Sequence, residues 1–219
     1  MPDAPSPSRD ESETRELVVA TARALSESGL SAGTSGNVSQ RWQDGFLITP
    51  SALPYDEMRP DDVVFVDAGG GPNGARRPSS EWRCHHDIYA ARPEVGGVVH
   101  AHPPFATTLA VHERDIPAFH YGVAAAGGDD IRCAPYAIFG SQELSDAVLE
   151  ALRDRRACLM AHHGIVALGA DLTASLRLAV EVEALSQQYW QALALGPPPL
   201  LTSVQMAEVI AKFADYRPD

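Results

Sequence analysis

Positive charge is scarce in this sequence. Lys and Arg total 17 against 29 Asp and Glu, which gives the 219 residues a formal net charge of −12. Nucleic acids and anionic membrane surfaces attract basic patches, so we expect neither as a partner. A small anionic substrate is compatible with this charge, because backbone N–H groups and hydroxyls can hold a phosphate without a basic surface.

Cysteines and long apolar stretches are scarce as well. The three cysteines, Cys84, Cys133 and Cys158, are odd in number and widely spaced, so they predict neither a disulfide framework nor a Cys-x-x-Cys zinc site. The sequence has no basic segment followed by an apolar run near its start, and no apolar stretch of membrane-spanning length. We therefore expect a cytoplasmic protein with no export signal and no membrane anchor.

Hydrophobic residues make up 45% of the chain, enough to bury one sizeable core. Residues 1–10, rich in Pro, Ser and Asp, are predicted to be a disordered lead, and residues 11–219 a single domain. Apolar periodicity and turn formers predict strands at 46–49, 63–66, 95–101, 158–161 and 165–168, helices at 11–28, 80–91, 103–112, 141–155, 172–195 and 204–213, and loops at 31–39 and 67–80. This order indicates a layered α/β domain whose sheet need not be parallel.

Two helix details can be checked against a structure. In the first helix, Leu17, Ala20, Ala24 and Leu25 share one face, which we expect to be buried. The second helix is predicted to begin with Ser80 as its N-cap, which would place Glu81 in the first turn.

Histidines provide the sharpest chemical signal. His100 and His102 are two residues apart in a predicted strand, so their imidazoles face the same side and can reach one metal ion. A His-x-His pair also occurs by chance, but His162 and His163 precede Gly164 between two predicted strands, where a glycine allows close approach. One of these two would complete a three-imidazole site suited to zinc, and residue chemistry alone does not say which.

Other polar residues have ordinary explanations beside functional ones. Glu81 could act on a proton, but a glutamate in a first helical turn usually just interacts with the helix dipole. Residues 33–37 and Ser79-Ser80 could cradle a phosphate, although such small-residue segments are usually turns. Tyr121 could donate a proton, yet a tyrosine in an apolar setting is by default a packing residue.

The other histidines are not expected to bind metal. Cys84, His85 and His86 are consecutive on a predicted helix and point in different directions, which disfavours a rival metal cluster. His112 and His120 are interpreted as surface or structural residues.

Together these residues give the sequence a strong resemblance to the class II aldolase and adducin-head family, from about residue 15 to about residue 216. The resemblance rests on ordered blocks of sequence: Gly33-Thr-Ser-Gly-Asn-Val-Ser39, Leu47-Ile-Thr-Pro50, Pro78-Ser-Ser-Glu-Trp82, His100-Ala-His102, Phe119-His-Tyr-Gly-Val-Ala-Ala-Ala-Gly-Gly128, Cys133-Ala-Pro-Tyr136 and His162-His-Gly164.

The resemblance implies a zinc-dependent enzyme that reversibly cleaves a ketose 1-phosphate into dihydroxyacetone phosphate and an aldehyde. The positions that match the family's motifs imply His100, His102 and His163 as zinc ligands, Glu81 as general base, Tyr121 as proton donor, and Gly36, Asn37, Ser51, Ser79 and Ser80 as the phosphate site. The resemblance also implies a mostly antiparallel central sheet flanked by helices, and a homotetramer in which a neighbouring subunit supplies Tyr121 to each site.

Two alternatives share this resemblance. An enzyme with the same fold and zinc could be an epimerase, dehydratase or decarboxylase of a related sugar phosphate. A non-catalytic module like the adducin head is disfavoured, because the three histidines and Glu81 are all present. One departure concerns phosphate binding: the family's Thr-Pro-x-Gly reads Thr49-Pro50-Ser51-Ala52. If this position has a positive φ, alanine is strained there by about 1 kcal/mol, which counts against the phosphate assignment.

Overall fold

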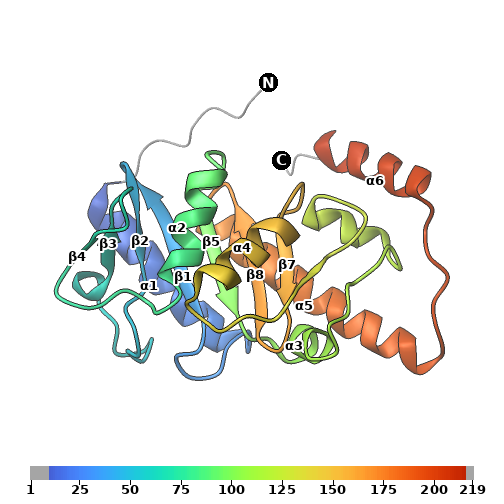
Figure 1. Ribbon diagram of the computed structural model, residues 1–219, viewed down its shortest axis with the longest axis horizontal. Helices are drawn as coiled ribbons and strands as arrows, with labels where there is room; N and C mark the ends of the chain where they lie inside the picture. Colours follow the sequence, from blue (N-terminus) through green and yellow to red (C-terminus); the bar gives the residue numbers. More distant parts are fainter. Residues whose placement is uncertain (1–9, 216–219) are drawn as a thin grey trace.

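The computed structural model describes residues 10–215, so the predicted disordered lead lies almost wholly outside the described residues. One mixed sheet of eight strands runs through these residues in the order β4-β3-β2-β1-β5-β8-β7-β6 (Figure 1). Every neighbouring pair is antiparallel except β6 and β7. The predicted α/β class with a mostly antiparallel sheet is confirmed. The strands are β1 (Asn37–Trp42), β2 (Gly45–Ile48), β3 (Val64–Val66), β4 (Pro72–Asn73), β5 (Gly97–Ala101), β6 (Cys133–Ala134), β7 (Ala157–Met160) and β8 (Gly164–Gly169).

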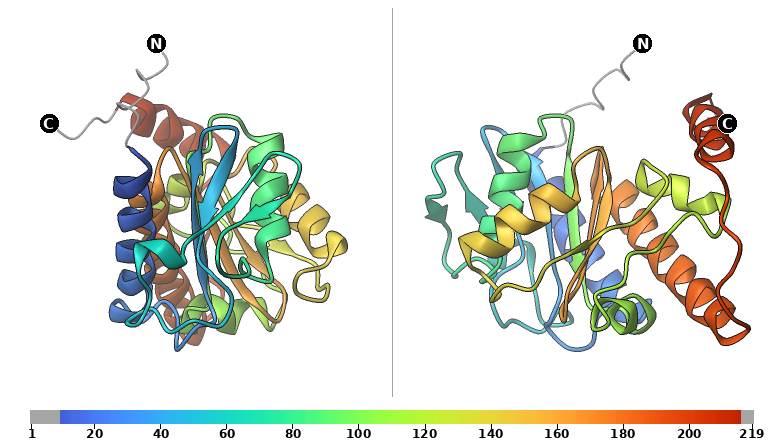
Figure 2. Two further views of the ribbon diagram at one scale, coloured as in Figure 1. Left: turned by 90° about the vertical axis from the view of Figure 1, so that its left-hand side faces the viewer. Right: turned by 45° about the vertical axis from the view of Figure 1, so that its right-hand side comes forward.

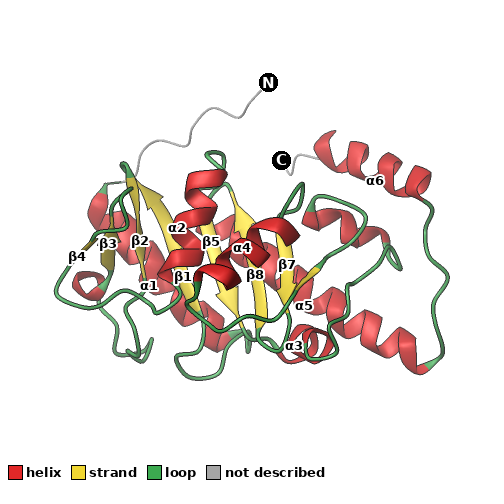
Figure 3. Cartoon of the chain, viewed as in Figure 1, coloured by secondary structure: helices red, strands yellow, loops and turns green. Residues whose placement is uncertain are grey.

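Helices cover both faces of the sheet (Figures 2 and 3). They are α1 (Glu11–Glu27), α2 (Trp82–Ala91), α3 (Pro104–Ala110), α4 (Gln142–Ala151), α5 (Leu172–Ala194) and α6 (Ser203–Asp215), with short 3-10 helices η1 (Pro60–Asp62) and η2 (Tyr121–Ala126). Helices α2 and α4 lie on one face, and α1, α3 and α5 lie on the other. Among the described helices, none combines the length and the apolar character needed to cross a membrane.

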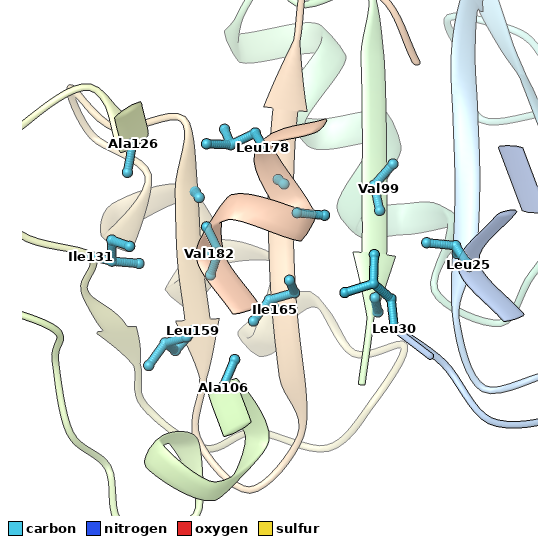
Figure 4. Packing of buried hydrophobic residues seen from close by; sticks show 14 of the residues in the cluster. Leu25, Leu30, Val99, Ala106, Ala126, Ile131, Leu159, Ile165, Leu178 and Val182 are labelled. Carbon is cyan, nitrogen blue, oxygen red and sulfur yellow. The ribbon is translucent and has the colours of Figure 1, made fainter. Parts of the chain in front are cut away.

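The sheet separates two apolar clusters because successive strand residues point to opposite faces. Val99 and Ile165 pack with Leu178 and Val182 of α5 in one cluster (Figure 4). Val98, the neighbour of Val99, belongs to the other cluster, on the side of α2 and α4. His100 and His102 continue the alternation of Val98, so they extend toward the α2 face.

The first helix begins with a capping box, in which the Asp10 side chain accepts from the Glu13 N–H at 2.8 Å. Its predicted buried face is partly wrong. Val18, Ala22 and Leu25 are buried, whereas Ala20 is exposed. The stripe that contacts the sheet is therefore rotated toward Val18, Val19 and Ala22.

Two boundaries also differ from the sequence-based expectation. Strand β1 begins at Asn37, inside the segment that we predicted to be a loop. Helix α2 begins at Trp82 with Glu81 as its N-cap, and no side chain caps it, so Ser80 is not the cap and Glu81 lies just before the first turn. Both boundaries lie at the α2 face of the sheet, where the polar residues of the candidate site are found.

Candidate metal centre and active site

Three histidines meet at one edge of the sheet. His100 lies near the end of β5 and His102 follows that strand, whereas His163 lies in the turn between β7 and β8. Strand β5 pairs with β8 along its whole length, with His100 opposite Val166. This pairing brings the turn before β8 beside the end of β5, so residues about 60 positions apart in the sequence become neighbours.

The imidazole rings of these three histidines lie at nearly equal distances from one another, and each is steeply inclined to the other two. Their centroids are 4.7, 4.8 and 4.9 Å apart, with interplanar angles between 70° and 74°. His100 Nδ1 lies 2.8 Å from the carbonyl oxygen of Ile165 and donates to it, which directs Nε2 to the centre of the cluster. His100 Nε2 is 2.9 Å from His102 Nε2. Two bare nitrogens at this distance repel each other unless a proton or a cation lies between them.

This donor set fits a divalent metal ion. One ligand atom from each of His100, His102, His163 and Glu81 lies within 4.8 Å of the others, the only such group found among residues 10–215. Three neutral imidazoles with a remaining position for substrate are the usual ligands of a catalytic zinc ion. Among residues 10–215, Cys84, His85 and His86, which the sequence analysis disfavoured as a rival metal cluster, form no such group.

The backbone explains why His163 and not His162 joins the cluster. His162 has a φ of +57°, which turns its side chain outward. That side chain is 49% exposed and lies 3.3 Å from the Glu113 carboxylate. Gly164 permits the close approach that its sequence position predicted, because a Cβ there would overlap the Ala101 carbonyl oxygen and lie 2.8 Å from the His102 ring.

Glu81 faces the histidines and not the amides of its own helix. Its Oε2 is 2.9 Å from His100 Nε2, and its Oε1 is 3.3 Å from His163 Nε2. Asn37 Nδ2 donates to Oε2 at 3.0 Å. The side chain is largely buried but borders the pocket described below. Glu81 is therefore placed beside the candidate metal site, and it makes no hydrogen bond that caps α2.

Burial and mutual charge set the protonation of this cluster. Burial, followed by the charge of His100, lowers the pKa of His102 to about 3 and that of His163 to about 4. Burial acts in the same direction on His100, but Glu81 outweighs it and raises the pKa of His100. Burial favours the neutral Glu81 carboxyl, yet the imidazoles of His100 and His163 with the Asn37 amide hold its pKa well below its usual value. At mildly acidic pH a protonated His100 thus lies beside an ionised Glu81.

A pocket of about 400 Å³ opens beside Glu81, His102 and His163. All five residues predicted to bind phosphate line it: Gly36, Asn37, Ser51, Ser79 and Ser80. Gly36 has no space for a side chain, since a Cβ would lie 2.6 Å from Ser31 Oγ and 2.8 Å from the His100 carbonyl oxygen. The structure therefore brings the predicted phosphate residues and the metal cluster to one cavity.

Not every polar group of these residues is available to a ligand. The N–H of Ser51 donates to the Arg77 carbonyl and that of Ser79 to the Thr49 carbonyl, both at 3.0 Å. These serines can therefore offer their hydroxyls but not their amides. Asn37 is the most committed of the set, because its side-chain amide already contacts Glu81 and His85.

Ala52 has a positive φ, the conformation in which alanine was expected to be strained. Its φ is +57°, a left-handed conformation that costs a non-glycine residue roughly 1 kcal/mol or more. Ala52 nevertheless lines the pocket next to Ser51. The loop thus adopts at Ala52 the left-handed turn that a glycine would adopt freely, and alanine makes this turn with strain.

Tyr121 lies apart from the pocket of its own chain. It begins η2, is 54% exposed, and its ring is 6.3 Å from that of Phe213 in α6. It is therefore not a residue buried in its own core. His120, which we interpreted as surface or structural, accepts from the Gly122 N–H at 3.1 Å, and His112 is exposed.

Several residues of the pocket were not singled out in the sequence. These are Tyr136, Ile138 and Phe139, each of which is more than half exposed. His162, the histidine that does not join the metal cluster, lines the pocket beside them. The Tyr136 and His162 rings meet edge to face at 6.0 Å. Tyr136 belongs to the Cys133–Tyr136 block of the family resemblance, which was the available signal. Ile138 and Phe139 stand in no regular element and had no signal.

The fold and this donor set are those of a metal-dependent enzyme. The chain belongs to the class II aldolase and adducin N-terminal domain family, which its residues 16–190 match. It is therefore an enzyme of the class II aldolase type and not a non-catalytic module.

Relatives agree with this assignment. The chain is 52% identical over 202 residues to the 5-methylthioribulose-1-phosphate/5-deoxyribulose-1-phosphate aldolase of Rhodospirillum rubrum, covering 92% of this chain and 91% of that protein. It is 46% identical over 200 residues to an L-fuculose phosphate aldolase of Escherichia coli, covering 91% and 93%. A solved structure of L-fuculose 1-phosphate aldolase, 34% identical, superposes with a TM-score of 0.91 over 95% of this chain and 100% of that one.

Proposed function

We propose that this chain is a zinc-dependent aldolase of cytoplasmic carbohydrate metabolism. It reversibly cleaves a ketose 1-phosphate, similar to L-fuculose 1-phosphate, into dihydroxyacetone phosphate and an aldehyde. The observation that carries this proposal is the convergence of three imidazole Nε2 atoms and the Glu81 carboxylate at the edge of a pocket rich in hydroxyls.

His100, His102 and His163 would hold Zn²⁺ through their Nε2 atoms. The low pKa values of His102 and His163 keep both rings neutral at physiological pH, as ligands must be. When bound, Zn²⁺ acts as a Lewis acid that polarises the substrate ketone and stabilises the negative charge that develops on it.

Glu81 is the proposed base. Its low pKa keeps it ionised at neutral pH, so it can take a proton from the hydroxymethylene carbon of dihydroxyacetone phosphate and return it in the cleavage direction. Tyr121 is the proposed donor of a proton to the new alkoxide. Because Tyr121 is exposed and does not line its own pocket, we propose that it acts in the site of a neighbouring subunit of a homotetramer.

The phosphate would bind among Gly36, Asn37, Ser51, Ser79 and Ser80. The serine hydroxyls can donate to phosphate oxygens, and the site needs no basic side chain, in keeping with the acidic composition. These contacts would hold the substrate equally in the ground and transition states, so they mainly set KM.

The aldehyde part of the substrate is proposed to end in an apolar group. Ile138 and Phe139 form an exposed apolar part of the pocket lining, and burying one methyl or methylthio group there is worth roughly 1–3 kcal/mol. A deoxygenated end is common to the substrates in the names of both relatives.

A substrate panel tests this proposal. Zinc-loaded enzyme should cleave 5-methylthioribulose 1-phosphate, 5-deoxyribulose 1-phosphate or L-fuculose 1-phosphate at least about tenfold better, as kcat/KM, than ribulose 1-phosphate with its terminal hydroxyl. Glu81→Gln should abolish solvent exchange of the dihydroxyacetone phosphate proton and retain the metal, because all three imidazoles remain. Near wild-type exchange in this variant would show that the base is another residue.

A further inference from the structure

A chain of buried hydrogen bonds extends behind Glu81, away from the pocket. Asn37 Nδ2 donates to the Glu81 carboxylate at 3.0 Å. His85 Nε2 lies 2.6 Å from Asn37 Oδ1, and His85 Nδ1 lies 2.6 Å from Ser39 Oγ. The Tyr89 hydroxyl reaches Ser39, at 2.8 Å from its carbonyl oxygen and 2.9 Å from its Oγ. Asn37 also belongs to the proposed phosphate site, whereas His85, Ser39 and Tyr89 have no part in the proposed reaction.

The network follows from two simple periodicities. Glu81, His85 and Tyr89 are four residues apart at the start and along α2, so they form one stripe on that helix. Asn37 and Ser39 are two residues apart on β1, so both point to the face that α2 covers. A polar helix stripe therefore fits against a polar strand face. All five side chains are buried, with exposures of 8% or less.

The Glu81 carboxylate fixes the direction of the hydrogen bonds that run through Asn37, His85 and Ser39. Glu81 is an acceptor only, so the Asn37 NH₂ group faces it and the Asn37 Oδ1 faces His85. Oδ1 is also only an acceptor, so His85 must carry its proton on Nε2. Burial lowers the pKa of His85 to about 3, so the ring is neutral and its Nδ1 accepts from the Ser39 hydroxyl. The donors of Asn37, His85 and Ser39 thus all point toward the Glu81 charge, an arrangement in which each bond strengthens the next, and the Tyr89 hydroxyl donates to the Ser39 carbonyl oxygen.

With a metal ion bound, the hydrogen bonds of the Glu81 side chain come from this network. Apart from Asn37, its side-chain contacts are to the Nε2 atoms of His100 and His163. Those nitrogens have no proton left to give once they are ligands of a cation. Asn37 is then the remaining hydrogen-bond donor to the carboxylate, and its own orientation depends on His85.

We propose that His85 is a positioning residue for the general base: backed by Ser39 and Tyr89, it orients the Asn37 amide, which holds Glu81 Oε2 and leaves Oε1 to move the proton. This inference rests on the proposed role of Glu81. It also gives Asn37 a second task beside phosphate binding. A misplaced base is expected to cost about 10- to 100-fold in turnover, the range seen for small displacements of catalytic groups.

Two amide variants of His85, similar in size and polarity, distinguish a role in positioning Asn37 from a role in filling space. The side chain of His85→Gln can place an N–H near the position of Nε2, so it retains the donor to Asn37. His85→Asn is one carbon shorter and reaches only the Nδ1 position beside Ser39. We expect the Gln variant to keep kcat within about threefold and the Asn variant to lose about 10-fold or more, with KM for the phosphorylated ketose unchanged within about twofold.

Metal content and thermal stability must be measured for both variants, since a structural role would lower both of these quantities and raise KM. Equal kcat values in the two variants, or a loss that appears in KM, would overturn the positioning role. If Glu81→Gln abolishes proton exchange while His85→Asn exchanges like the parent, only this inference fails. If Glu81→Gln itself exchanges normally, the proposed function of Glu81 fails.

A measurement without catalysis tests the same assignment in the unaltered protein. Nitrogen-15 NMR of histidine-labelled, metal-loaded enzyme should show His85 as the neutral Nε2–H tautomer at neutral pH, identified by the signal that His85→Gln removes. Ser39→Ala should shift that Nδ1 resonance, because it removes the donor to Nδ1. An Nδ1–H tautomer or an imidazolium ion at this position would refute the network as described.

Discussion

The protonation of the metal cluster predicts how metal affinity changes with pH. Protons compete with the metal for the same imidazole nitrogens. His102 and His163, with pKa values of about 3 and 4, take up protons only in strong acid. The pKa of His100 is raised above its usual value, so below about pH 6.5 this ring is mostly protonated. Between about pH 4 and 6.5, one proton and not three should therefore oppose the metal.

The size of the effect follows directly. One competing proton weakens binding tenfold per pH unit, so from about pH 6.5 to 5 the Zn²⁺ affinity should fall about 30-fold, or about 2 kcal/mol. Three ordinary imidazoles would lose about 4,000-fold over the same interval. The sign is that of a raised pKa: the metal is held best above the pKa of His100 and is released as the pH falls through and below it.

Competition with a coloured chelator at constant ionic strength measures this slope. Glu81→Gln removes the charge that raises the pKa of His100, so its affinity should change less than tenfold over the same interval. His112→Gln alters an exposed histidine outside the cluster and should keep the parental slope. Release of two or three protons per metal in the parent enzyme would refute the burial-based assignment of the cluster.

Three further predictions concern the pocket and the assembly. Gly164→Ala should destabilise the fold by about 1–3 kcal/mol in urea unfolding and weaken metal binding, because its Cβ would overlap the carbonyl before His102; unchanged values would contradict this crowding. Ser79→Ala should raise KM for a phosphorylated ketose with little change in kcat, and equal turnover of the unphosphorylated ketose by the parent would exclude the phosphate site. Mixed oligomers of Glu81→Gln and Tyr121→Phe chains, each inactive alone, should regain activity if sites are shared; activity no higher than the parental average would exclude sharing.

The candidate metal ligands illustrate how far sequence reasoning extends. His100 and His102 were predicted to share a face because a strand alternates every residue, and the structure places them so. Residue chemistry did not choose between His162 and His163. The choice depends on the left-handed conformation of His162, which no propensity of histidine predicts. Only the family resemblance indicated it.

The burial of polar side chains in β1 explains why this strand was not predicted. Residues 37–42 were assigned to a loop or left unassigned because Asn37 and Ser39 lack the apolar alternation of a strand. In the structure both are buried against α2, where their hydrogen bonds to Glu81, His85 and Tyr89 replace apolar contacts. A strand whose inward residues serve a polar network is invisible to a hydrophobicity pattern. The apolar strands β2 and β3, by contrast, were predicted almost to the residue.

The pairing of β5 with β8 implies that an ion bound at the candidate metal site would stabilise only the correctly paired strands. If the β5–β8 ladder slipped by one residue, the residue opposite His100 would point to the other face of the sheet. His100 would then be separated from His163. The three nitrogens would then no longer converge, and such a chain could not bind the ion. Since a ligand stabilises only the conformation that it binds, the metal selectively retains molecules in which these two distant segments have paired in the correct register.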